Sequence, residues 1–123
     1  MIAKRTGNKR AYPVKAGIAL LSGEPVVLAA GYLTNVLGTA SCVGMVTLPA
    51  DNGAGLDGEL TAEVEVGEFK FANAGDITVA NVGATVYFAD ANTVSVSDDT
   101  GTRATAGKLV QVDADGVWVE LGV

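Results

Sequence analysis

Short apolar runs separated by glycine and polar turn residues recur along this chain of 123 residues. The clearest alternation lies in residues 59–66, where Leu60, Ala62, Val64 and Val66 alternate with glutamate and threonine. A period of two places the apolar side chains on one face of a strand and the polar ones on the other. The pattern therefore predicts a strand with one face in a core and the other in water.

Further strands are predicted where β-branched and aromatic residues gather between turn signals. Turn residues at 90–92 and 113–116 separate two pairs of such runs and predict two hairpins. Residues 49–58, with their Asn-Gly and Asp-Gly signals, predict a loop. We expect about eight to ten strands, no internal repeat and no substantial helix. The remaining predicted strands cover 26–29, 43–48, 68–71, 86–88, 94–96, 109–112 and 117–121.

Composition agrees with a folded all-β chain. Apolar residues make up 49% and charged residues 18%, with 16 glycines, which is typical of a globular protein built from short strands and tight turns. The length suits one domain with its own core. We expect a single small β-barrel or β-sandwich over residues 16–123, preceded by an extended N-terminal arm over residues 1–15.

Charge is divided unevenly along the chain. Lys4, Arg5, Lys9, Arg10 and Lys15 precede the first acidic residue, whereas the other 108 residues carry three basic and all fourteen acidic side chains. Like charges in a short segment resist folding alone and favour an acidic partner surface. We therefore expect the first twelve residues to be disordered until they bind such a surface, with a merely solvated N-terminus as the alternative.

Two aromatic residues are candidates for contact with a partner. Tyr12 is the one aromatic residue among the basic ones. Trp118 alternates with Val117, Val119 and Leu121, so it leaves its strand on the polar face, beside glutamate. A large ring on that face is covered either by its own chain or by a partner. We expect Trp118 near an interface with another subunit or a partner rather than in the centre of its own core.

The sequence offers little catalytic chemistry. It has no histidine, which excludes Ser-His-Asp and Cys-His arrangements and histidine metal ligands. Cys42, the one cysteine, stands in an apolar run and is expected to be a small buried hydrophobic residue. Asp113 and Asp115 are spaced like the start of a calcium loop, but a hairpin turn explains them more simply. We expect no enzyme activity, no cofactor and no metal site.

Other classes of partner fit poorly. The acidic body would be repelled by nucleic-acid phosphates, and the basic segment has no set of aromatic residues for base stacking. The longest apolar runs, near 26–30, are too short to span a membrane, and the N-terminus does not read as a secretory signal. We expect neither nucleic-acid nor membrane binding, and folding in a reducing cytoplasm.

The order of glycines and strands resembles a known family. Residues 17–27 are similar to an early segment of the capsid cement, or head decoration, proteins of tailed bacteriophages and prophages. Residues 83–90, 93–97, 101–110 and 112–119 are similar to the C-terminal part of those proteins. The resemblance covers residues 13–123 and carries no catalytic residues.

This resemblance implies a non-catalytic protein that binds the outer surface of an assembled capsid and stabilises it. Its partners would be the major capsid protein and other copies of itself, with a trimer favoured. It would be made in the host cytoplasm and reside on the virion exterior. The main alternative is a ligand- or carbohydrate-binding β module on a phage or cell surface, which would expose a row of aromatic residues; this chain has seven aromatic residues in all.

Overall fold

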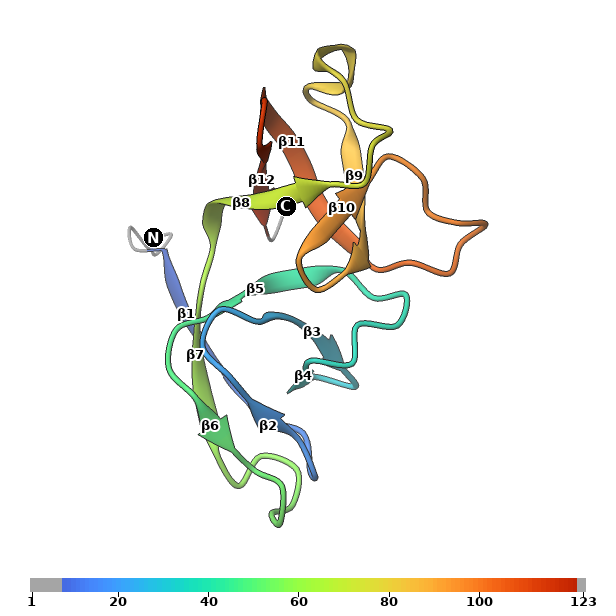
Figure 1. Ribbon diagram of the computed structural model, residues 1–123. Helices are drawn as coiled ribbons and strands as arrows, with labels where there is room; N and C mark the ends of the chain where they lie inside the picture. The colour runs from blue at the N-terminus through green and yellow to red at the C-terminus, as the bar shows by residue number, and fades with distance from the viewer. Residues whose placement is uncertain (1–7, 122–123) are drawn as a thin grey trace, which may run out of the picture.

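The computed structural model describes residues 8–121, and these are almost entirely β (Figure 1). The all-β prediction is confirmed. Helix is confined, in this part of the chain, to one 3-10 turn, η1 (Val79–Asn81). The twelve strands are β1 (Lys9–Pro13), β2 (Ala19–Leu20), β3 (Pro25–Ala29), β4 (Tyr32–Thr34), β5 (Cys42–Val46), β6 (Ala50–Asp51), β7 (Thr61–Glu65), β8 (Gly67–Asn73), β9 (Thr85–Asp90), β10 (Thr93–Ser95), β11 (Thr105–Asp113) and β12 (Gly116–Leu121).

Two five-stranded units make up most of the molecule. In the N-terminal unit the strand order is β1-β7-β5-β3-β4, and a parallel bridge between Val14 and Leu33 connects its two edges. In the C-terminal unit the order is β8-β12-β11-β9-β10, and β10 pairs in parallel with β8 to close a barrel. Strands β2 and β6 form a separate two-stranded sheet, so the predicted loop over 49–58 contains a short strand.

The two units have the same topology. Numbered within each unit, the strands lie in the order first-fifth-fourth-second-third, all neighbours are antiparallel, and the closing contact is parallel. The registers agree in detail, because Val26 faces Gly44 in one unit and Val86 faces Gly107 in the other, each beside a register shift. The prediction of no internal repeat is therefore wrong. The repeat cannot be seen in the sequence, because many equivalent positions hold unlike residues, such as Met45 and Lys108.

A matching pair of turns supports this equivalence. The buried Thr34 hydroxyl accepts a hydrogen bond from the Val36 amide at 3.0 Å, just after β4. The buried Ser95 hydroxyl accepts one from the Ser97 amide at 3.0 Å, just after β10. A hydrogen bond from an amide to the hydroxyl two residues earlier therefore follows the third strand of each unit.

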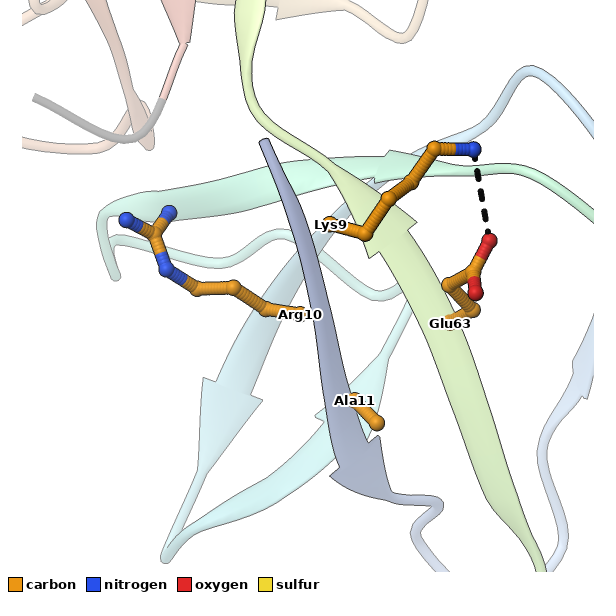
Figure 2. Close-up of a pocket in the computed structure, with 4 residues that line it drawn as sticks. All are labelled: Lys9, Arg10, Ala11 and Glu63. Atoms are coloured by element: carbon orange, nitrogen blue, oxygen red, sulfur yellow. Dashed lines mark hydrogen bonds and ion pairs between the residues drawn. The ribbon is translucent and has the colours of Figure 1, made fainter. Parts of the chain in front are cut away.

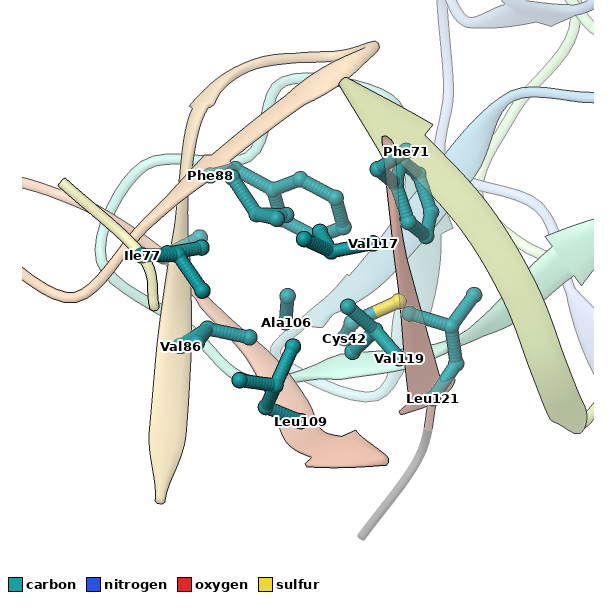
Figure 3. Close-up of a cluster of buried hydrophobic side chains, with 12 residues drawn as sticks. Cys42, Phe71, Ile77, Val86, Phe88, Ala106, Leu109, Val117, Val119 and Leu121 are labelled. Atoms are coloured by element: carbon teal, nitrogen blue, oxygen red, sulfur yellow. The ribbon is translucent and has the colours of Figure 1, made fainter. Parts of the chain in front are cut away.

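Each unit has its own core. Val14, Leu20, Val26, Leu33, Val46, Ala62 and Val64 are the buried residues of the N-terminal core. The C-terminal core is larger and contains an edge-to-face pair between Phe71 and Phe88, with ring centroids 5.5 Å apart (Figure 3). The alternation predicted for 59–66 holds at Ala62 and Val64, but Leu60 lies outside β7 and is 40% exposed.

The units meet along β5. Cys42 is buried in the C-terminal core although its strand belongs to the N-terminal sheet, and Met45 packs against the same core. The Thr105 amide also donates to the Ala40 carbonyl at 3.1 Å. Cys42 is therefore a small buried hydrophobic residue, as expected, and it lies between the two units.

Candidate interaction site

The basic segment is a strand over most of its described length. Residues 9–13 form β1, which pairs antiparallel with β7 from Lys9 opposite Glu65 to Pro13 opposite Thr61. The expectation of a disordered arm is therefore wrong for Lys9, Arg10 and Tyr12. Strand β7 offers a sheet edge whose backbone groups need hydrogen-bond partners, and its glutamates attract Lys9. Lys4 and Arg5 lie outside the described residues.

The outer face of this strand pair carries opposite charges. The Lys9 ammonium lies 3.4 Å from a Glu63 carboxylate oxygen and 3.5 Å from one of Glu65. The hydrogen bond with Glu63 raises the pKa of Lys9 above its usual value. Both partners are substantially exposed, and such pairs contribute little to stability. These contacts fix the position of β1 more than they strengthen the fold.

Arg10 is different from Lys9. Within residues 8–121 it has no ion pair and no side-chain hydrogen bond. Its side chain points away from Lys9, on the opposite side of β1 (Figure 2). An open pocket of about 310 Å³ is lined by Lys9, Arg10, Ala11 and Glu63. The pocket and the unpaired guanidinium together make this edge of the sheet a candidate surface for an acidic or aromatic partner group.

Tyr12 is less accessible than the sequence suggested. It alternates with the outward-facing Ala11 and packs, half-buried, against the N-terminal core. Its ring therefore helps to hold β1 on the body of the protein. A contact between Tyr12 and a partner stays a prediction for the part of the ring that remains exposed.

Trp118 leaves β12 on the outer face of the barrel, as strand parity predicts. Val117 and Val119 are fully buried, while Trp118 is half-buried. Its indole N–H donates to an Asp113 carboxylate oxygen at 2.9 Å, and the Lys70 ammonium lies 5.9 Å from its ring centroid. The chain's own Lys70 thus covers part of the ring by a cation–π contact. An intermolecular role for Trp118 stays a prediction.

A charged cluster surrounds this indole. The Lys70 ammonium lies 2.5 Å from an Asp115 oxygen and 3.6 Å from one of Asp113. Hydrogen bonds from Gln111 and Trp118 lower the pKa of Asp113, and the bond from Lys70 lowers that of Asp115. Sequence reasoning missed Lys70, because only the pairing of β8 with β12 brings it opposite Trp118. Asp113 and Asp115 were read correctly as hairpin residues.

The structure separates the predicted contact residues into two surfaces. Lys9 and Arg10 lie on the N-terminal sheet, and Trp118 lies on the C-terminal barrel. In the part of the chain that the structure describes, no cluster of three or more histidine, cysteine or acidic residues could hold a metal ion. Burial raises the pKa of the Cys42 thiol to about 11, so it is protonated and unreactive at neutral pH.

Comparison with known proteins does not assign a partner to these surfaces. No protein-family model, curated protein or solved structure matches the chain. Among the residues described, no helix is both long enough and apolar enough to cross a membrane.

Proposed function

We propose that this protein is a non-catalytic capsid decoration protein, which binds the outer surface of an assembled phage capsid and stabilises it. The observation that carries the proposal is the resemblance of residues 83–119 to the C-terminal part of such proteins. These residues coincide with strands β9 to β12, four of the five strands of the closed barrel. The resemblance therefore covers nearly a complete structural unit rather than scattered turns.

The charge distribution supports a role in docking. Lys9 and Arg10 lie on an edge strand of a body whose residues 16–123 carry a net charge of −11. Lys4 and Arg5 precede this strand and extend the same positive charge. Opposite charge on the shell would speed encounter and set the orientation of binding.

Stabilisation would follow from linkage. A protein that binds only the expanded lattice lowers the free energy of that state by its differential affinity, and the effect is repeated at every site on the shell. Such a role needs a rigid fold rather than a reaction centre. The major capsid protein would be the partner, and the virion exterior the location.

The proposal is tested by mixing the full-length protein with undecorated, expanded capsids and sedimenting them. We expect the protein to sediment with the capsids and to raise the temperature at which they disassemble. The double variant Lys4→Glu/Arg5→Glu should bind more weakly and lose much of the salt sensitivity of binding. The double variant Lys15→Glu/Lys108→Glu changes the net charge equally and serves as the control. Failure of the wild-type protein to sediment with capsids of its own phage would reject the proposal.

A further inference from the structure

The two units of the chain pack against each other. The two surfaces that meet there can be compared with the equivalent surfaces of the other unit. On the N-terminal unit, the outer face of β5 presents Cys42 and Met45 to the C-terminal core. In Figure 3 the Cys42 thiol lies beside Val119 and Leu121 at the end of that core. The end of the C-terminal barrel therefore packs on the outer face of the N-terminal sheet.

The equivalent sheet face of the C-terminal unit contacts the N-terminal unit only at its margin among the described residues, where the Thr105 amide donates to the Ala40 carbonyl. The shared register places Thr105 and Lys108 where the N-terminal unit has Cys42 and Met45. It places Trp118 and Glu120 where that unit has Glu63 and Glu65. The face is thus polar, with one half-buried indole at its centre and an exposed, unpaired Glu120 beside it.

The equivalent barrel end of the N-terminal unit is also incomplete. Val66 occupies the position of the buried Leu121 but is only half-buried. Arg10 occupies the position of Phe69, which packs against the C-terminal core. This end therefore carries a half-buried arginine that lines the 310 Å³ pocket, where the other unit has a half-buried aromatic ring.

We propose that neighbouring copies of this chain repeat the internal contact head to tail: the Trp118 face of one copy docks against the Arg10 end of the next. The chemistry is complementary, since a guanidinium pairs with a carboxylate and stacks on an indole. Arg10 meets Glu120 and Trp118 of the neighbouring copy in this arrangement. The pocket is at the lower limit of the ~300–1,000 Å³ range that holds small organic groups, which suits part of an indole ring.

This contact joins two different surfaces, so it is heterologous and closes into a ring where the rotation between copies permits. The polar character of the contact makes it weaker than the contact inside the chain, which is built on Cys42 and Met45. The proposal concerns contact between copies and holds with or without the shell.

The test is sedimentation equilibrium of the full-length protein from about 1 µM to about 1 mM, a range that brackets weak to moderate dissociation constants. We expect the wild-type protein to associate. Arg10→Glu and Glu120→Arg should each raise the dissociation constant at least tenfold by placing like charges together. The double variant Arg10→Glu/Glu120→Arg should restore association, and so should an equimolar mixture of the two single variants.

The control is Lys15→Glu/Glu120→Arg, which has the same net charge but leaves Arg10 in place and should not restore association. A wild-type protein that stays monomeric over the whole range overturns the proposal, as does a charge-reversed pair that fails to associate. If the protein stays monomeric yet Arg10→Glu loses binding to expanded capsids, the Arg10 end belongs to the shell contact instead. In that outcome the proposed function stands and this inference fails.

Discussion

The glycine at the register shift of β11 gives a sharp test of how the barrel is held together. In Gly107→Ala, the new methyl group would overlap the Glu120 carbonyl oxygen and lie 2.9 Å from its carbon. Both atoms belong to the backbone of β12, so no flexible side chain can move aside. The two strands must separate where Lys108 faces Glu120. Gly107 therefore permits the close approach that closes the barrel.

The expected cost follows from two terms. A backbone conformation that is almost confined to glycine costs about 1–3 kcal/mol for alanine. Separation of the strands weakens about two hydrogen bonds, at about 1 kcal/mol each. The free energy of unfolding should therefore fall by about 3–5 kcal/mol, a large part of the ~5–15 kcal/mol typical of a domain. At ~4 °C per kcal/mol, the melting temperature should fall by about 12–20 °C.

The measurement is urea and thermal unfolding followed by circular dichroism. Gly31→Ala is the matched control, because Gly31 has a positive φ of 90° but no atom within 4 Å of the new methyl group. It should lose only the strain contribution of about 1–3 kcal/mol. Gly44→Ala, with the Glu65 carbonyl oxygen at 2.9 Å, should fall between the two. If Gly107→Ala and Gly31→Ala lose equal stability, the close contact with β12 does not hold the barrel.

Three further predictions concern the core, the thiol and the charged cluster. Phe88→Ala removes one ring of the buried aromatic pair and should cost about 3–5 kcal/mol in urea unfolding, whereas a loss below about 1 kcal/mol would mean that the core collapses around the gap. Cys42 should resist alkylation at pH 8 in the native protein and react at once in denaturant; rapid native labelling would contradict its burial. Because the pKa values of Asp113 and Asp115 are lowered in the folded state, their contribution to stability is present above their usual value of 3.8 and is lost as pH falls below it. Thermal unfolding between pH 5 and pH 2 should show a smaller decline in Asp113→Asn/Asp115→Asn than in wild type, and parallel curves would show that the cluster is not responsible.

Local signals in the sequence predicted the local structure well. The β9–β10 and β11–β12 hairpins formed where turn residues separate apolar runs, because a hairpin depends on neighbouring residues. The outward position of Trp118 followed from strand parity alone. The pairing of β1 with β7 was not predicted, because the charge of Lys9 favoured a free arm and its glutamate partner at 63 lies 54 residues away. The predicted contact residues therefore divide into a strand edge and a barrel face, a division that only the topology reveals.

The polar face of the C-terminal unit lacks the apolar side chains through which the two units of one chain contact each other. In arrays of stacked repeats, the terminal repeat needs a polar outer face, since an apolar one would continue to recruit copies. Here Thr105 and Lys108 replace Cys42 and Met45 at the equivalent positions, so the apolar contact is used once, inside the chain. The contact between copies that we propose would then depend on charged and aromatic groups. A contact of this kind would weaken with added salt and would strengthen where many copies are held close together.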